Sequence, residues 1–329
     1  MMKKLLLVSI LLALVVIVLG AYARLTDAGL GCPDWPGCYG HLSFSKTTEN
    51  IEIAQQAFPE RPFEEHKAWN EMIHRYFASA LGFLILVIFI NSLFSKAYNK
   101  PVKLPLFLLC LVCFQGALGM WTVTLNLLPA VVMGHLLGGF TVLSCLFLLY
   151  LRLIPYRILG GDAVLRQFGK YTILGIVILT GQIALGGWTS ANYAALACTE
   201  LPICEGNWYE RLDFTGAFSI PEAENYEFGV HGYAERMTMH IVHRIGALIT
   251  FLYLCWLGIR LYAAAHSSLI KKLSILMILV LGVQIALGVS NVVYSLPIAV
   301  AVMHNAVAAC LMLVLPLVTR CIAKLRRIR

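Results

Sequence analysis

The sequence predicts an all-α integral membrane protein whose eight transmembrane helices form two pseudo-symmetric four-helix bundles. Two compositional observations indicate the membrane class. Hydrophobic residues make up 60% of the 329-residue chain and charged residues 13%, whereas a soluble domain carries roughly 25% charged residues. The mean hydropathy is +0.79. A third observation, a set of motifs that recurs further along the chain, predicts the two bundles.

The polar residues are confined to short segments between apolar runs of about 20 residues, the length that crosses a bilayer as a helix. Because lipid offers the backbone no hydrogen-bond partners, each run is expected to be helical. The first run follows Lys3 and Lys4 and could be a signal peptide, but its length and its place in the repeat favour a retained helix. In chain order the expected spans are 5–23, 72–94, 104–125, 130–151, 171–190, 237–260, 273–293 and 297–319.

The segments between the spans differ in charge, which sets the topology. The positive-inside rule places the basic segments and both termini in the cytoplasm, so that the two long loops, 24–71 and 191–236, lie on the outer side. The net charge of +8 reflects this topology, and nucleic-acid binding is not expected because the basic residues are scattered over several short segments. Most of the 25 Lys and Arg residues fall in the segments 3–4, 96–103, 152–170, 260–272 and 320–329.

Four histidines occupy equivalent positions of an internal repeat. His74 and His135 are 61 residues apart, as are His243 and His304, and the two pairs are offset by 169 residues. Each half of the chain therefore carries one histidine near the start of its second span and one near the start of its fourth.

Other motifs extend the repeat over the whole chain. QGALG at 115–119 recurs as QIALG at 284–288, and the segments after the first and the fifth span align at an offset of 166. Both halves begin inside and cross four times, so the repeat is parallel, with its axis along the membrane normal. The sequence therefore predicts two units, residues 1–155 and residues 156–329.

Each long outer loop contains a pair of cysteines with five residues between them. These pairs are Cys32 with Cys38 and Cys198 with Cys204. Two pairs at one spacing on the oxidising side of a membrane favour disulfides over metal sites or free thiols. The remaining cysteines lie in spans or at their inner edges, where we expect small apolar side chains; they are Cys110, Cys113, Cys145, Cys255, Cys310 and Cys321.

The four histidines lie near the outer ends of their spans, at a shared depth. Ionisable side chains within a membrane are costly and usually functional, and imidazole is a common ligand of haem iron in helical bundles. Four histidines at matched positions therefore predict two bis-histidine metal or haem sites. The pairing is open, since His74 could pair with His135 or, across the halves, with His243. The chain contains no CxxCH motif, so covalent haem attachment is not expected.

Charged neighbours distinguish the two histidine sites. Arg75 and Arg244 each follow a candidate ligand and could bind a haem propionate or anchor the helix end. Glu71 lies three residues before His74, on the same helix face, and the equivalent residue in the second half is His240. Glu71 could also serve as a helix N-terminal acid. This asymmetry predicts chemistry at the first site and electron transfer at the second.

Together these features resemble the haem A synthase family, membrane enzymes of cytochrome oxidase maturation. The resemblance covers essentially the whole chain, including the eight-helix duplication. The paired cysteines are similar to those of the bacterial branch, whereas mitochondrial relatives commonly lack the first pair. The segment 41–70, which includes His66, matches no part of the family pattern. The motifs that carry the resemblance are GAYARLTDAGLGCPDWPGC at 20–38, ExxHR at 71–75, HR at 243–244, His135 and His304.

The resemblance implies an oxidoreductase that converts the C8 methyl of haem O to a formyl group, giving haem A for cytochrome oxidase. It implies Glu71 as the reactive carboxylate, His74 and His135 as ligands of the substrate haem, and His243 and His304 as ligands of a haem b. Implied partners are haem O, the lipid bilayer, haem O synthase, cytochrome oxidase assembly factors and an unidentified electron acceptor. The implied location is the bacterial inner membrane, with the haem sites toward its outer side.

Two other functions are compatible with the same histidines. A di-haem b protein that transfers electrons or handles haem without methyl oxidation needs the four ligands but not Glu71. A transporter built from repeats would use the histidines as proton relays and would hold no haem.

Overall fold

The computed structural model of the chain describes residues 2–42, 52, 55–94, 101–154 and 163–323. Within these residues eight helices are long and apolar enough to cross a bilayer, which confirms the eight expected spans and a multi-pass membrane protein. They are α1 (Met2–Leu25), α3 (Glu65–Phe94), α4 (Lys103–Thr124), α5 (Pro129–Leu153), α6 (Gly169–Ala191), α8 (Tyr233–Ala264), α9 (Ser268–Val293) and α10 (Ile298–Ala323). The outer loop before α8 also contains η2 (Trp208–Arg211) and α7 (Phe214–Ala217), and η1 (Ala163–Phe168) precedes α6.

Several helices begin earlier than their apolar runs, α3 by the most and α9 at Ser268, before the expected span at 273. Helix α3 starts at Glu65, before the expected span at 72, and α8 starts at Tyr233, before the expected span at 237. Hydropathy detects the part of a helix that lies in lipid, and a polar first turn continues outside it. The Glu235 carboxylate stabilises that first turn of α8 by accepting a hydrogen bond of 2.7 Å from the backbone N–H of Gly232.

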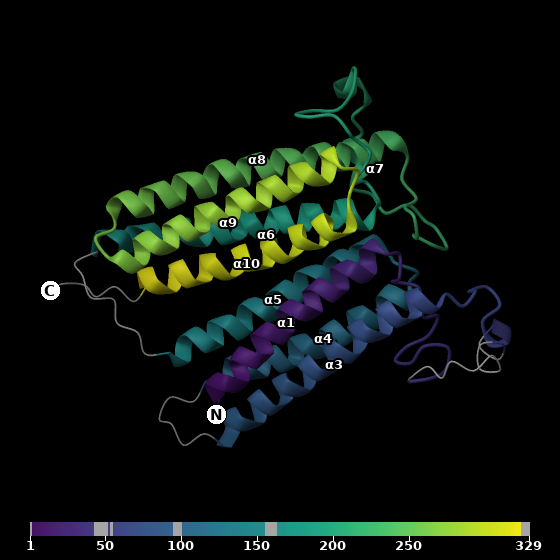
Figure 1. Cartoon of the computed structure of the whole chain (residues 1–329), viewed down its shortest axis with the longest axis horizontal. Helices are drawn as coiled ribbons and strands as arrows, with labels where there is room; N and C mark the ends of the chain where they lie inside the picture. Colours follow the sequence, from purple (N-terminus) through teal and green to yellow (C-terminus); the bar gives the residue numbers. More distant parts are fainter. Residues whose placement is uncertain (1, 43–51, 53–54, 95–100, 155–162, 324–329) are drawn as a thin grey trace.

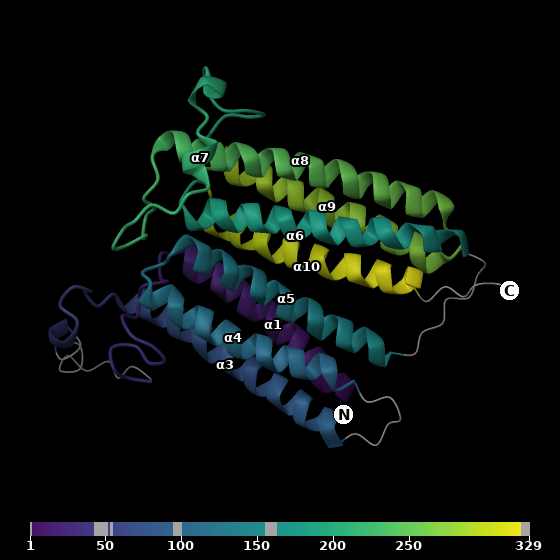
Figure 2. The same cartoon turned by 180° about the vertical axis from the view of Figure 1, so that it is seen from behind.

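Within each half, the four long helices pack in a closed cycle. In the first half α1 packs on α3, α3 on α4, α4 on α5, and α5 on α1; the second half repeats this order with α6, α8, α9 and α10. Helices α3 and α5 therefore lie diagonally opposite each other, as do α8 and α10. These diagonal helices are the ones that carry the four histidines. The two bundles lie side by side, with α3 and α8 on opposite outer sides of the molecule (Figures 1 and 2).

The halves meet through their first and fourth helices, because α1 packs on α10, α5 on α6, and α5 on α10. Leu143 and Leu146 of α5 and Leu315 of α10 are fully buried in the cluster that forms this contact. Helix α1 begins and α10 ends at the same end of the bundles, and both cysteine-containing loops lie at the opposite end (Figure 1).

Local backbone features recur at the offset of the sequence repeat. Asp27 and Tyr193, 166 residues apart, have φ angles of 50° and 53°, and the Tyr193 hydroxyl donates to Asp27 at 3.0 Å. Arg24 donates at 2.6 Å to the carbonyl of Ser190, again 166 residues away. Equivalent positions of the two halves thus contact each other, as expected near a two-fold axis. The superposition of the halves stays a prediction, as does their boundary at 155/156, which lies outside the described residues.

Candidate functional site

The first bundle brings His74 of α3 and His135 of α5 face to face. Their ring centroids are 6.3 Å apart and the ring planes are inclined at 83°. Helices α3 and α5 occupy diagonal corners, so the two rings point into the bundle from opposite sides. This arrangement answers the question of pairing for the first half, because His243 belongs to α8, on the far side of the molecule (Figure 1).

The second bundle carries His243 on α8 and His304 on α10, again at diagonal corners. The two imidazoles are close enough to interact electrostatically. In each half the two repeat-related histidines therefore lie on diagonal helices of one bundle, and the sequence offsets of 61 residues correspond to these diagonals.

A glycine on a neighbouring helix makes room for each imidazole. A side-chain carbon added at Gly20 would lie 3.0 Å from His74, and one added at Gly119 would lie 3.5 Å from His135. In the second half the corresponding distances are 3.0 Å from Gly186 to His243 and 3.1 Å from Gly288 to His304. Small residues let the helix backbones approach the rings closely.

The first histidine pair fits a single iron held by both imidazoles. Two imidazoles on one metal hold their centroids roughly 6 Å apart, since each bond from metal to nitrogen is about 2.0–2.1 Å and each ring adds little more than 1 Å. The observed 6.3 Å between His74 and His135 agrees with this separation. One turn from the ring contacts, added side chains at Gly116 and Gly139 would meet no atom within 4 Å. The first bundle therefore has open space beside the histidines, which a flat macrocycle needs.

Glu71 and Arg75 form a buried ion pair beside the first histidine pair. The Glu71 carboxylate accepts from Arg75 Nε at 3.0 Å, and the two side chains are only 11% and 10% exposed. Glu71 also interacts electrostatically with His135 across the bundle. The carboxylate predicted from the sequence as the reactive group is thus close to both histidines of its half.

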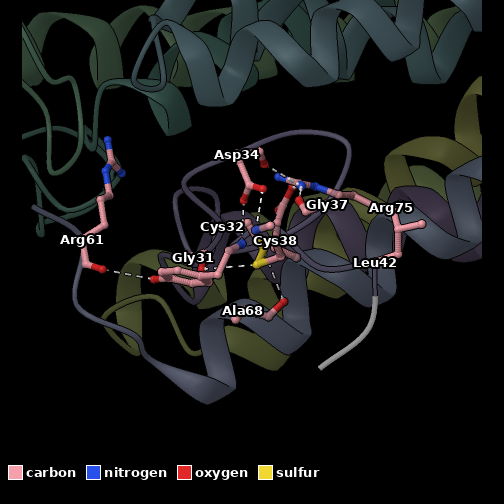
Figure 3. The surroundings of a disulfide bond; sticks show 12 residues. Gly31, Cys32, Asp34, Gly37, Cys38, Leu42, Arg61, Ala68 and Arg75 are labelled. Carbon is pink, nitrogen blue, oxygen red and sulfur yellow. Dashed lines mark hydrogen bonds and ion pairs between the residues drawn. A yellow bond between two sulfur atoms is a disulfide. The ribbon is translucent and has the colours of Figure 1, made fainter. Parts of the chain in front are cut away.

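Arg75 also anchors the disulfide loop. The structure joins Cys32 to Cys38, as predicted, and Arg75 Nη1 donates to the carbonyls of Asp34, at 2.9 Å, and Gly37 within that loop (Figure 3). Among the described residues Arg75 Nη2 is buried and has no hydrogen-bond partner. The loop contacts were not anticipated from the sequence. The propionate role of Arg75 stays a prediction, and Nη2 is the atom available for it.

The second half has the same contact between an arginine and a disulfide loop, but no carboxylate pairs with the arginine. Cys198 is joined to Cys204, again as predicted, and Arg244 donates to the carbonyls of Cys198 at 2.6 Å and Glu200 at 2.7 Å. Its Nε faces His240 Nε2 at 3.4 Å, where Arg75 faces Glu71. Arg244 therefore donates its hydrogen bonds mainly to the loop. Its binding of a haem propionate also stays a prediction.

Three glutamines contact or approach the histidine sites, and the sequence predicted a role for none of them. They are Gln115, which is buried, and Gln182 and Gln284, which are partly buried. The amide Nε2 of Gln182 lies 3.1 Å from His243 Nδ1, and that of Gln284 lies 3.2 Å from His304 Nε2. The position equivalent to Gln182 in the first half is Val16, which has no polar atom to offer His74. A polar residue in an apolar span was the signal that could have identified these groups.

A loop from the second half covers the outer end of the first bundle. Tyr226 is 8% exposed and packs against Leu30 and Leu127, and its backbone N–H donates at 3.0 Å to the carbonyl of Asn126. Arg61 of the first outer loop donates to the Asn126 side chain at 2.7 Å. Both outer loops thus meet at the turn between α4 and α5, seven residues before His135.

Replacing Arg75 by leucine is expected to destabilise the protein more than replacing Arg244 by leucine. Removing one partner of a buried ion pair costs about 3–5 kcal/mol because the other charge stays buried and unpaired, and Arg75 leaves Glu71 in that state. Arg244 leaves the imidazole of His240, which carries no fixed negative charge. Thermal unfolding of the two variants in detergent measures the difference. Equal losses, with no recovery in the double variant Arg75→Leu/Glu71→Gln, would contradict the prediction.

A membrane bundle with one inward-facing histidine pair in each of two four-helix halves defines the class of the protein: an integral membrane protein with two internal histidine sites. The chain belongs to the family of cytochrome oxidase assembly proteins, whose family model matches residues 3–316.

Relatives named "Heme A synthase" match over nearly the whole chain. The protein from Shewanella oneidensis is 52% identical over 310 residues, covering 94% of this chain and 92% of its own. The protein from Rickettsia prowazekii is 26% identical over 324 residues, covering 93% of each chain. A third, from Chelativorans sp., is 27% identical over 312 residues, covering 89% of this chain and 83% of its own.

Proposed function

We propose that this protein is a haem A synthase, an oxidoreductase that converts the C8 methyl group of haem O to a formyl group and so supplies haem A for cytochrome oxidase. The observation that carries the proposal is the buried Glu71 carboxylate beside the facing pair of His74 and His135. The second half has the histidines without the carboxylate. The 52% identity to a relative of that name over 94% of the chain supports the same activity.

The first half holds the substrate. His74 and His135 ligate the iron of haem O from opposite sides, and the open space at Gly116 and Gly139 accommodates the ring. Arg75 Nη2 is the donor available to a propionate. The substrate enters from the lipid between helices, since its farnesyl tail is apolar.

The second half holds a permanent haem b, ligated by His243 and His304. A bound haem b supplies reversible one-electron transfer. The amide nitrogens of Gln182 and Gln284 lie 3.1 Å and 3.2 Å from one ring nitrogen of each histidine. Val16 stands in place of Gln182 in the first half, so His74 lacks the corresponding contact.

Conversion of a methyl to a formyl group removes two hydrogens from the carbon and adds one oxygen atom. When water supplies that oxygen, four electrons and four protons are released, two of the protons coming from the water. An acceptor outside the chain takes the electrons, by way of the second half. Glu71 accepts or relays a proton at its carboxylate, or stabilises positive charge at the reacting carbon. Arg75 holds that carboxylate toward the site at 3.0 Å.

The protein lies in the bacterial inner membrane with both termini in the cytoplasm and both haem sites toward the outer side. The basic segments at one end of the bundles and the disulfide loops at the other support this orientation. Haem O synthase, cytochrome oxidase assembly factors and the electron acceptor are its proposed protein partners.

Haem extraction and chromatography of the purified protein test the proposal. In a host that supplies haem O, we expect haem B together with haem O or haem A. Haem B alone would indicate a di-haem b electron carrier or haem-handling protein, the alternative that dispenses with Glu71. Colourless protein would contradict both and leave a transporter with histidine proton relays.

A further inference from the structure

We propose that Gln115 of α4 is a substrate-binding residue of the first half, and that its side-chain amide donates a hydrogen bond to an oxygen atom at the edge of the bound haem. This inference rests on the proposed function, because it takes the first half to be the substrate site. The proposal is based on the side-chain amide of Gln115, which is buried without a hydrogen-bond partner and lies against Gly138.

The Gln115 amide is buried without a partner. The residue is 8% exposed, and no described residue forms a hydrogen bond with its Nε2. Leaving a buried N–H donor unsatisfied is costly, and buried polar groups in native proteins almost always have partners. A buried amide donor without a partner inside a bundle indicates that a bound ligand supplies the hydrogen-bond acceptor.

Gly138 of α5 creates the space that the amide occupies. A side-chain carbon at position 138 would lie 1.7 Å from Gln115 Nε2 and 2.6 Å from its amide carbon, distances that no real side chain permits. The equivalent position in α10 is Val307. At that position the second half has a larger side chain, and Gln284, the equivalent of Gln115, reaches His304 at 3.2 Å. The two halves thus differ both in the residue at this position and in the contact that the glutamine makes.

The free amide lies beside the histidine pair. Gln115 is one turn from Gly119, whose added side chain would lie 3.5 Å from His135, and Gly138 is three residues beyond His135 on the same helix. Positions three residues apart share a helix face. The amide donor is therefore next to the space between His74 and His135, one turn further from the outer surface than His135.

The donor requires an acceptor, and the proposed reaction introduces one. The methyl group of haem O cannot accept a hydrogen bond, whereas the hydroxyl and formyl oxygens that replace it can. A donor satisfied only after oxidation favours the oxidised forms over the methyl form and holds the alcohol in the site until the second oxidation. An oxygen atom that haem O already carries can accept the same hydrogen bond. Binding measurements with haem O and haem A distinguish this acceptor from the oxygen that the reaction introduces.

The variant Gln115→Leu tests the inference through binding of added haem O and haem A and through the resonance Raman spectrum of bound haem A. For an oxygen introduced by the reaction, we expect haem A to bind roughly tenfold more weakly, the effect of one hydrogen bond, with haem O unchanged. The formyl C=O stretch should move to higher wavenumber. Equal weakening of both haems, with an unshifted stretch, would assign the bond to an oxygen already on the substrate. Unchanged binding of both haems together with an unshifted stretch would overturn the proposal.

Gly138→Val provides the matched structural test. Closing the space should drive the Gln115 amide onto His135, the arrangement that Gln284 and His304 have in the second half, and so lower the occupancy of the first site while the haem of the second half is retained. That retained haem reports that the variant folds.

If the wild type binds haem O but never yields haem A, the proposed function fails while the haem O binding of Gln115→Leu still tests the donor. If Gly138→Val binds haem O as the wild type does, the role assigned to Gly138 is wrong.

Discussion

Replacing Glu71 by glutamine is expected to lower haem A formation by roughly 10²- to 10⁴-fold, the usual contribution of a positioned acid or base. Glutamine preserves the size of the side chain and an oxygen that can accept from Arg75, but it removes the negative charge and the proton acceptor. Because neither histidine ligand is altered, the haem content per protein should stay unchanged. Haem A and haem O are measured by extraction from a host that has no activity of its own.

His240→Gln is the matched control for this substitution. His240 occupies the equivalent position in the second half and faces Arg244 in the way that Glu71 faces Arg75. We expect His240→Gln to retain most of the haem A formation, since the second half only transfers electrons in the proposed scheme. Normal haem A production by Glu71→Gln, with normal haem content, would rule out a catalytic role for Glu71.

Removing one histidine from each half is expected to remove different haems. His304→Ala should lower the retention of haem B by more than the roughly 10- to 100-fold that follows loss of an outer partner of a metal ligand, because a ligand itself is lost. His135→Ala should retain haem B and lose the extractable haem O and haem A. The measurement is the ratio of the three haems in protein purified from the same host.

His66→Ala serves as the control for the histidine series, since its side chain is 69% exposed in the first turn of α3 and we expect normal haem content. The two ligand variants distinguish the assignment of the halves. Haem A is expected to fall in both variants, since its formation needs both halves. If both variants lose haem B, or if His304→Ala loses haem O and keeps haem B, then the substrate and haem b sites have been assigned to the wrong bundles.

The helices and the disulfides were predictable because each depends on a strong local signal. A run of about 20 apolar residues in lipid has to be helical, since its backbone has no other hydrogen-bond partners. The observed bounds differ from the expected spans mainly where a polar first turn extends the helix, as at Glu65 in α3. The cysteine pairs, six residues apart in the outer loops, needed only a compatible loop and an oxidising compartment.

The roles of the arginines and glutamines were not predictable in the same way. Arg75 and Arg244 were expected to bind propionates or to anchor helix ends, and the structure uses both to hold carbonyl groups of the disulfide loops. Backbone carbonyls have no signature in the sequence, so a long guanidinium side chain reveals its partners only when the loop is folded around it. The orientation of Gln115 depended on Gly138, in a different helix.

The sequence by itself determined the membrane class, the eight spans, the repeat and the identity of the four histidines, because hydropathy, spacing and charge act along the chain. The tertiary structure decided which histidines face each other, since the diagonal corners of a bundle are set by how four helices close into a cycle. It also decided how the two sites differ. Of two equivalent residues, Gln284 contacts a histidine, whereas the Gln115 amide nitrogen lies against Gly138 and has no hydrogen-bond partner among the described residues. Packing of that kind is a property of the folded bundle.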